Sequence, residues 1–149
     1  MPQAEIRLVE LTPATAKALG DVADDVFDAV IDPARLAEFV ADPRHLLWFA
    51  EAGGQVVGFA SATELFHPDK PPQIFINEIG VAPAWRRRGI GRALVEKLVA
   101  AARERGCNYA WLGTDTDNTA GNACFRSVPG SERAGSFVMW EWQPGGKSA

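Results

Sequence analysis

Four arginines and two glycines lie within eight consecutive residues, from Trp85 to Arg92 (WRRRGIGR). A glycine-rich turn that opens a helix presents unpaired backbone N–H groups, which attract anions together with the helix dipole. Glycines let the backbone approach a ligand closely, and guanidinium groups form charge-assisted hydrogen bonds with phosphates. A solvated basic helix start is the alternative. The pattern predicts a phosphate site, more specifically a pyrophosphate site, at Arg86, Arg87, Arg88, Gly89, Ile90, Gly91 and Arg92.

A second charged region has the opposite sign. Between Asp21 and Asp42 the chain carries seven acidic residues and one arginine, Arg35, although the whole chain has a net charge of only −4. Carboxylates gathered in this way attract a polycationic ligand and raise its association rate, an effect that salt weakens. The alternative is an ordinary solvated helix face. One anionic and one cationic region together indicate two partners of opposite charge.

Hydrophobic patterning supplies the elements that must position these residues. Alternating or apolar runs predict strands at 5–11, 46–52, 56–63, 73–81, 107–116 and 136–143. Helices are expected from Thr12-Pro13, with Val22, Val26 and Val30 on one face, from Asp32-Pro33, from about Gly89 to Arg105, and at 118–128. This order predicts an α/β or α+β sheet with helices on both faces. No linker divides the chain, so residues 1–149 are expected to form a single domain.

Composition argues against several classes of protein. Contents of 47% hydrophobic and 23% charged residues are typical of a soluble globular protein. No apolar run approaches the roughly 20 residues of a membrane span, and the N-terminus does not resemble a secretory signal, so a cytoplasmic protein is expected. The acidic net charge argues against nucleic-acid binding. Two cysteines and two histidines predict neither a disulfide framework nor a metal site.

The residues around the basic turn resemble a known family. Arg86-x-x-Gly89-x-Gly91, preceded by INEIGVAP and followed by RALVEKLVAAARERG, is similar to the acetyl-CoA signature of the GCN5-related N-acetyltransferases (GNAT). YAWLGTDT and DNTAGNACFRSVPG, with Asn118 seven residues before Phe125, resemble the family's next strand and helix. The resemblance implies a mixed, mostly antiparallel sheet of six to seven strands with helices on both faces. Within the family, the chain is most similar to the small aminoglycoside 3-N-acetyltransferases.

This resemblance implies acetyl-CoA as the co-substrate and direct transfer of its acetyl group to an amine. The main chain at Ile79 and Val81 would contact the pantetheine arm and the thioester carbonyl, where an N–H group could stabilise an oxyanion. Asn118 would also contact the pantetheine arm, although its position suits a helix N-cap equally well. Phe125 would complete the cofactor-binding set that begins with the basic turn.

The resemblance also implies a general base. An ammonium substrate must lose a proton before it can attack, and Glu78 lies on the strand beside the expected acetyl position. Burial in so apolar a strand would raise the pKa of Glu78; the alternative is an edge-facing or salt-bridged glutamate. Phe125 stands where many family members carry a tyrosine hydroxyl near the leaving sulfur. Water, Ser127 or Cys124 would then supply that proton.

The acceptor implied is a small cationic amine, with an aminoglycoside ahead of polyamines and protein or peptide amines. The expected substrate-binding residues are Asp24, Asp25, Asp28 and Asp115. A non-enzymatic acyl-CoA-binding or regulatory module is the alternative, because Phe125 removes the usual acid. The resemblance is compatible with a homodimer, and neither a nucleic-acid nor a membrane partner is expected. The acceptor atom and the size of the acyl group stay open.

Overall fold

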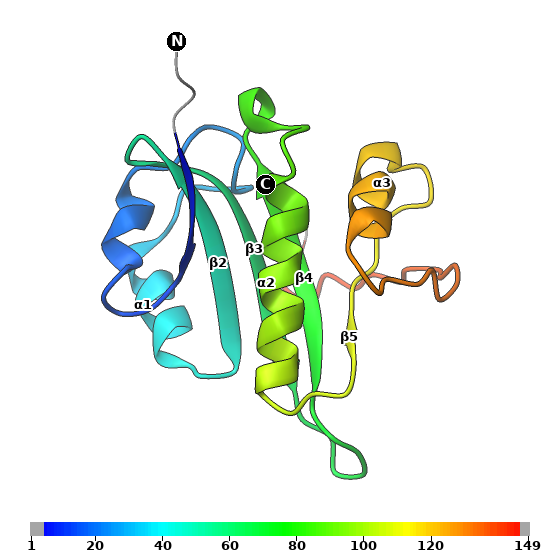
Figure 1. Ribbon diagram of the computed structural model, residues 1–149. Coiled ribbons are helices and arrows are strands. Elements are labelled where there is room, and N and C mark those ends of the chain that lie inside the picture. The colour runs from blue at the N-terminus through cyan, green and yellow to red at the C-terminus, as the bar shows by residue number, and fades with distance from the viewer. Residues whose placement is uncertain (1–4, 147–149) are drawn as a thin grey trace.

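A computed structural model describes residues 5–146 and contains a five-stranded sheet in the order β1-β2-β3-β4-β5 (Figure 1). The first four strands pair antiparallel, and β5 pairs parallel to β4. The expected mixed, mostly antiparallel sheet is therefore confirmed, whereas the expectation of six to seven strands is wrong for the described residues. The strands are β1 (Ile6–Glu10), β2 (His45–Ala52), β3 (Gln55–Leu65), β4 (Gln73–Val81) and β5 (Ala110–Trp111).

The strand expected at 136–143 is not part of the sheet. This segment has no regular secondary structure, and its large apolar side chains are exposed. β5 is also much shorter than expected, because its pairing with β4 ends at Trp111. Alternation identifies a segment that could pair as a strand, but pairing also needs a neighbouring edge, which the sequence pattern does not reveal.

Three α-helices and two short 3-10 helices are present in the described part of the chain. They are α1 (Pro33–Ala41), α2 (Ile90–Glu104), α3 (Thr119–Ser127), η1 (Ala16–Gly20) and η2 (Pro83–Trp85). The Asp32 side chain caps α1, and the Asn118 side chain caps α3, so both helices begin at the expected residues. Within residues 5–146, no helix has the length and apolar character that a membrane crossing requires.

The helix expected from Thr12-Pro13 through Val30 is wrong. Only η1 forms there, and residues 21–31, which we call the acidic loop, have no helix. Val26 is 4% exposed but Val30 is 97% exposed, so the two valines do not share a buried face. Asp25 has a left-handed φ of 62°, a conformation that a regular right-handed helix does not contain. The valines spaced four apart therefore belong to an irregular segment, in which only some of the apolar side chains are buried.

The sheet separates two layers of the molecule. On one face lies α2, whose Leu94 and Leu98 are fully buried and whose Lys97 lies over the Trp48 ring of β2. Residues an odd number apart on a strand point to opposite faces, so His45 of β2 lies on the other face. There it contacts Phe39 of α1. Helices on both faces are therefore confirmed, with most of the core between α2 and the central strands.

Candidate active site

β4 and β5 part after a short stretch of pairing (Figure 1). They pair only at Ile74–Ala110 and Phe75–Trp111, and beyond this point no strand lies on the β5 side of β4 among the described residues. Alternate N–H and C=O groups along 76–81 are therefore open to a ligand. The expected main-chain contacts at Ile79 and Val81 fall within this unpaired stretch.

A cavity of about 250 Å³ lies at this opening. Its walls come from five segments of the chain: the acidic loop, β3, β4, the residues after β5 and the start and body of helix α3. The predicted site residues Glu78, Ile79, Asn118, Phe125 and Asp28 all line it. The structure therefore brings a carboxylate of the predicted catalytic strand together with part of the predicted cofactor-binding and acceptor-binding sets.

A β-bulge determines how Glu78 is presented. Ser61 pairs with Glu78 while Ala62 pairs with Ile76, so Asn77 is the extra residue on β4. The Asn77 Nδ2 group donates a hydrogen bond of 2.8 Å to a threonine hydroxyl on β3. Glu78 itself is exposed to solvent, so the burial expected from its apolar neighbours is wrong. The bulge, rather than desolvation, distinguishes this acid from an ordinary strand residue.

The acidic loop is packed tightly onto the sheet face that carries Glu78. Phe27 stacks on Phe59 of β3, with ring centroids 3.9 Å apart. The Val26 carbonyl passes so close to Gly80 of β4 that a Cβ atom at Gly80 would collide with its oxygen. A main-chain bridge between Val22 and β3 ties down the start of the loop. These contacts hold one wall of the cavity without any regular helix.

One of the four aspartates expected to bind the acceptor lines this cavity. Asp28 does so together with Glu78, whereas Asp24, Asp25 and Asp115 are exposed and lie outside the lining. Asp115 instead holds the start of α3, because its main-chain carbonyl accepts hydrogen bonds from Asn118 N–H and Asn122 Nδ2. The carboxylates near the opening are therefore two rather than a large cluster.

Other members of the acidic stretch have structural partners. Asp21 accepts a hydrogen bond from Gln55 at 3.3 Å, and Asp32 caps α1. Asp42 forms an ion pair of 2.9 Å with Arg44, and hydrogen bonds from Arg44 lower the pKa of Asp42 to about 2. The acidic residues between Asp21 and Asp42 therefore do not act as one group. Some lie in the loop at the cavity, and others cap a helix or form an ion pair elsewhere in the fold.

The turn before α2 has the open backbone that its glycines predict. Gly89 stands at the N-cap with φ 78°, and no side chain caps this helix. Arg87 also adopts a left-handed conformation, with φ 63°. In contrast to α1 and α3, the first N–H groups of α2 lack a side-chain acceptor. A helix end without a side-chain cap is what the predicted anion site requires.

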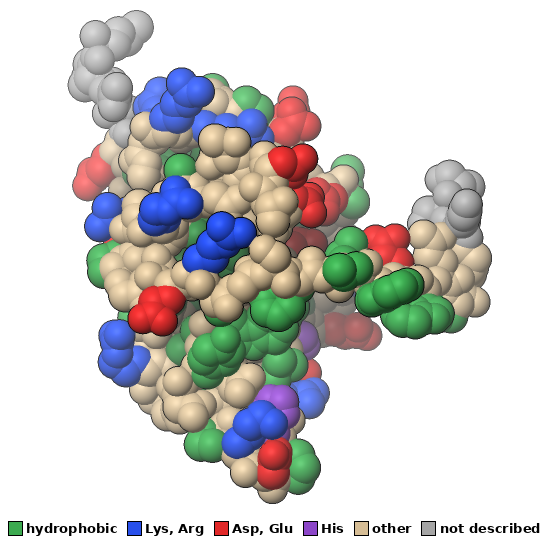
Figure 2. Space-filling model, turned by 90° about the vertical axis from the view of Figure 1, so that its right-hand side faces the viewer, with side chains coloured by type: hydrophobic (Ala, Val, Ile, Leu, Met, Phe, Trp, Pro, Cys, Tyr) green, Lys and Arg blue, Asp and Glu red, His purple; other side chains and the backbone are tan. Residues whose placement is uncertain are grey.

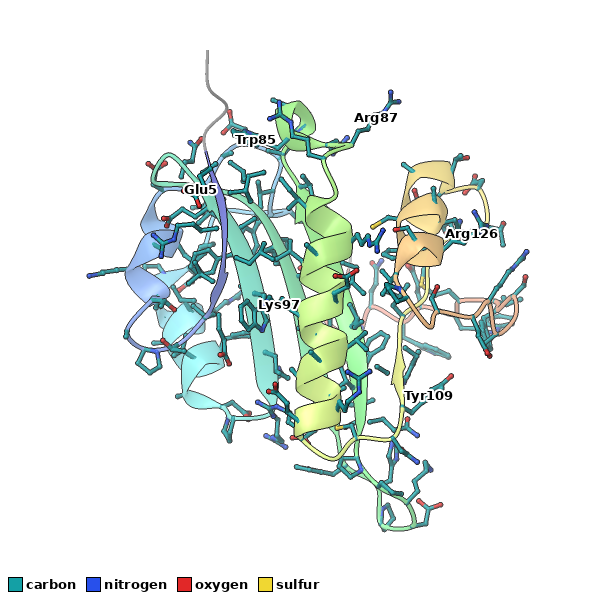
Figure 3. The ribbon with its side chains drawn as sticks, viewed as in Figure 1. Glu5, Trp85, Arg87, Lys97, Tyr109 and Arg126 are labelled. Carbon is teal, nitrogen blue, oxygen red and sulfur yellow. The ribbon has the colours of Figure 1, made fainter. Side chains whose placement is uncertain are left out.

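The arginines of this turn differ in their surroundings. Arg88 lies over the Trp85 ring at 4.6 Å, and Arg92 forms an ion pair of 2.8 Å with Glu96. Arg86 donates a 3.1 Å hydrogen bond to a main-chain carbonyl at the end of β4. Arg87 forms no hydrogen bond or ion pair with another described residue and points away from the body (Figure 3). Three arginines therefore shape the turn, and Arg87 extends into solvent.

Asn118 connects two walls of the cavity. Its Oδ1 atom accepts a 3.1 Å hydrogen bond from Gly121 N–H, which caps α3, and its Nδ2 group donates to Thr114 Oγ1 at 2.9 Å. The N-cap alternative considered from the sequence is therefore confirmed. Sequence reasoning missed Thr114 and Asn77 as lining residues. The polar run directly after a predicted strand could have indicated Thr114, whereas a bulge leaves no such sign.

A larger surface hollow of about 820 Å³ lies near the opposite end of α2. Its charged side chains are largely paired, with Arg105 bound to Glu64 at 3.1 Å and Arg44 bound to Asp42. The 15 residues of α2 place it roughly 22 Å from the basic turn. We therefore assign the candidate active site to the smaller cavity. No group of three or more His, Cys, Asp or Glu suited to a metal occurs within residues 5–146.

An open helix end, parted strands and a nearby carboxylate fit the class of acetyl-CoA-dependent transferases. The model of the acetyltransferase (GNAT) family matches residues 16–128, and the chain belongs to this family. It is an N-acetyltransferase, and enzymes of this type use acetyl-CoA. The chain is 35% identical over 127 residues to N-alpha-acetyltransferase RimI of Mycobacterium tuberculosis. This alignment covers 84% of this chain and 77% of that protein. The chain spans 56% of the length of a second relative, the N-acetyltransferase Mb2688 of Mycobacterium bovis.

Two solved aminoglycoside acetyltransferases share the fold. One, from an uncultured soil metagenomic sample, has a TM-score of 0.78 at 16% identity, covering 93% of this chain and 97% of its own. The other, AAC(6')-Iy in complex with a CoA-containing bisubstrate analogue, has a TM-score of 0.75 at 20% identity, covering 94% and 99%. The predicted family is confirmed, and the relatives favour an enzyme over a non-enzymatic binding module.

Proposed function

We propose that this enzyme acetylates a primary amine of a small cationic substrate, with an aminoglycoside as the favoured acceptor. The observation that carries the proposal is the presence of Glu78 and Asp28 in one cavity beside the unpaired edge of β4. Two carboxylates attract a cationic amine and hold it next to open main-chain groups. The fold shared with aminoglycoside acetyltransferases supports this class of acceptor. The 3-N position predicted from the sequence is the regiochemistry to be tested.

Acetyl-CoA fits the backbone groups of α2 and β4 that have no partner within the described chain. The uncapped N–H groups of α2, with Arg87 beside them, would hold the pyrophosphate. The unpaired edge of β4 at Ile79 and Val81 would hold the pantetheine arm, with Asn118 and Phe125 on the opposite wall. Bound there, the co-substrate supplies an activated acetyl thioester. The other members of the proposed cofactor set are Arg86, Arg88, Gly89, Ile90, Gly91 and Arg92.

Glu78 is the proposed general base. It lines the cavity and is open to solvent, so its carboxylate can take a proton from the ammonium and release it to water. Asp28, which lines the same cavity, would attract the acceptor and orient it. Phe125 cannot donate a proton, but a thiol is a fairly good leaving group, with a reference pKa of about 8.5. Water can therefore complete the reaction.

A protein α-amine is a second candidate acceptor. It is favoured by one observation, the 35% identity with an N-alpha-acetyltransferase over most of the chain. A peptide would place its N-terminal ammonium where the first proposal places the amine of an aminoglycoside. The two acceptors make different demands on Asp28, because a multiply charged aminoglycoside gains more from a second carboxylate than a peptide with a single charge.

The test is release of free CoA thiol from acetyl-CoA in the presence of aminoglycosides, polyamines or peptides. Turnover with an aminoglycoside and a rise in KM for Asp28→Asn would support the first acceptor. Turnover restricted to peptides would select the second. Mass and fragmentation of the acetylated product would identify the modified nitrogen, including the 3-N position. If no amine of any class stimulates thiol release, the proposed reaction is wrong.

Glu78→Gln tests the base. General-base catalysis contributes about 10²–10⁴-fold to rate, so we expect kcat to fall by that factor while the Kd of acetyl-CoA is unchanged. Glu104→Gln is the matched control, because Glu104 is an exposed glutamate at the far end of α2. Equal turnover in the two variants would remove Glu78 from the mechanism.

A further inference from the structure

The bulge on β4 places two neighbouring polar residues, Asn77 and Glu78, on one face of the sheet. Glu78 pairs with Ser61 of β3, and Asn77 Nδ2 donates a hydrogen bond to the hydroxyl of Thr63, two positions further along β3. Residues two apart on a strand share a face, so Ser61 and Thr63 direct both partners to the same side. In a regular strand Asn77 and Glu78 would lie on opposite faces. Because of the bulge, both line the cavity of about 250 Å³ from the same side.

A series of polar contacts leads from Asn77 across the sheet to Asp42. Thr63 Oγ1 lies 3.3 Å from His45 Nδ1, and His45 Nε2 lies 3.8 Å from Asp42 Oδ2. Arg44 donates hydrogen bonds to both carboxylate oxygens of Asp42, at 3.1 and 2.9 Å, which lowers the pKa of Asp42 and keeps it ionised near neutral pH. An ionised carboxylate only accepts hydrogen bonds. The series therefore ends at a fixed acceptor, and this acceptor decides the direction of donation along it.

The direction of donation orients the amide of Asn77. A hydrogen on His45 Nε2 faces the Asp42 carboxylate, which leaves Nδ1 of the neutral ring as an acceptor. The Thr63 hydroxyl donates its single hydrogen to this Nδ1 atom, so it accepts from Asn77 Nδ2, in agreement with their 2.8 Å contact. The Oδ1 atom of Asn77 is then turned away from Thr63. It accepts no hydrogen bond from the residues that the structure describes, and Asn77 is exposed to solvent, so this oxygen is open to a ligand.

The charges around this oxygen favour a cation. Glu78 and Asp28 line the same cavity, and no Lys or Arg does so among the described residues. Asn77 lies on the sheet face away from α2, because its partner Thr63 pairs with His45, which contacts α1. This face is toward the right in Figure 2, where acidic side chains gather in the upper half of the view while basic ones lie mainly to the left. A primary ammonium group carries three N–H donors. Two carboxylates and one amide oxygen offer three acceptors for them.

We propose that Asn77 Oδ1 accepts a hydrogen bond from the substrate ammonium, as a third acceptor beside Glu78 and Asp28. Thr63 is a positioning residue, because its hydroxyl holds the amide with the oxygen toward the ligand. When Glu78 takes one hydrogen of the ammonium, the other two remain on Asp28 and Asn77 and keep the nitrogen in place. This inference rests on the proposed function, and it applies equally to an aminoglycoside and to a peptide amine. It makes Asn77 a determinant of affinity for the amine rather than of the chemical step.

The first test compares Asn77→Leu with Asn77→Asp in steady-state kinetics, with the amine that the wild type acetylates. Leucine matches the shape of asparagine but cannot accept a hydrogen bond, whereas aspartate keeps an acceptor oxygen. We expect the KM of the amine to rise by at least about tenfold for Asn77→Leu, because a hydrogen bond to a charged group is lost. For Asn77→Asp it should stay at or below the wild-type value. The kcat of Asn77→Leu and its Kd for acetyl-CoA should stay within about twofold of the wild type, because the lost contact is made equally before and during the reaction.

The second test concerns the positioning role of Thr63. Thr63→Val removes the hydroxyl at nearly constant shape and should raise the KM by about 2–10-fold, whereas Thr63→Ser keeps the hydroxyl and should retain the wild-type value. Because Thr63 acts through Asn77, the double variant Thr63→Val/Asn77→Leu should have the KM of Asn77→Leu alone. Thr15→Val is the matched control. The Thr15 hydroxyl is hydrogen-bonded to the main chain of Glu10 and Thr12, outside the cavity, so its loss should lower the Tm and leave the KM unchanged.

Four results would overturn the inference, each in a different way. A wild-type KM in Asn77→Leu would mean that the amide oxygen does not contact the amine. Equal rises in KM for Asn77→Leu and Asn77→Asp would mean that Asn77 supports the bulge and is not an acceptor. Additive effects in the double variant would remove Thr63 as a positioning residue. A wild type that acetylates no amine would overturn the proposed reaction, and this inference with it.

Discussion

Gly80→Ala provides the sharpest test of how the acidic loop is held over β4. A Cβ at this position would collide with the Val26 carbonyl oxygen and would lie 2.9 Å from the Phe59 ring. Gly80 has an ordinary negative or extended φ, so the effect of alanine is steric rather than conformational. Backbone cannot rotate away as a flexible side chain can, and the loop must therefore move off the sheet.

Overpacking of this kind costs about 1–3 kcal/mol. With a central value of about 2 kcal/mol, the Tm of a domain of this size should fall by roughly 4–8 °C. The measurement is thermal unfolding followed by circular dichroism. Because the collision lies on the loop side of the sheet, the Kd of acetyl-CoA should change little while the KM of the acceptor rises.

Gly20→Ala is the matched control. Gly20 has no neighbouring atom within 4 Å of a Cβ and no positive φ, so its Tm should stay within about 2 °C of the wild type. If Gly80→Ala and Gly20→Ala unfold at the same temperature, the loop does not contact β4 as the structure shows, and the assignment of Asp28 to the cavity is lost with it.

Two further predictions concern other parts of the chain. Arg44 lowers the pKa of Asp42 from 3.8 to about 2. A carboxyl whose pKa is lowered by folding stabilises the folded protein at pH values above its pKa in the unfolded chain, and this stabilisation is lost as pH falls through its pKa in the folded protein. The stability deficit of Arg44→Ala in urea titrations should therefore be present near neutral pH and should shrink between about pH 4 and pH 2; a deficit independent of pH would contradict this. Gly91→Ala would place a Cβ 3.2 Å from Cys124 Sγ, so it should weaken acetyl-CoA binding in calorimetry, and Cys124→Ala should restore part of the loss. A double variant no better than Gly91→Ala would show that the contact with Cys124 is not the cause.

Much of the scaffold follows from local chemistry. Gly53 and Gly54, with φ values of 57° and 81°, form the turn between β2 and β3, at the gap between the strands expected at 46–52 and 56–63. The caps at Asp32 and Asn118, and the amphipathic pattern of α2, place the helices within one or two residues. The basic turn was predictable for the same reason, because a glycine N-cap and its neighbours decide the conformation of a few consecutive residues.

The remaining features depend on contacts between distant segments. The bulge at Asn77 exists only relative to β3, and the burial of Val26 depends on a glycine 54 positions away on β4. Valines at helical spacing therefore predicted a helix where the sheet instead holds a loop. The alternation at 136–143 likewise indicated a segment that could form a strand, but it did not indicate whether a neighbouring strand was there to pair with it. Hydrophobic periodicity reports which residues can share a face, and tertiary pairing decides whether they do.

The acidic loop has a consequence for how this enzyme could change under selection. Its attachment depends on Val22, Val26 and Phe27, whereas Asp28, which lines the cavity, is exposed. Exposed substitutions away from such contacts usually change stability by no more than about 0.5 kcal/mol. The wall of the cavity that the acidic loop forms can therefore accumulate sequence changes while the sheet and the helix end beside it stay intact. Divergence in acceptor choice among proteins with this loop would require neither a new fold nor a compensating stabilising mutation.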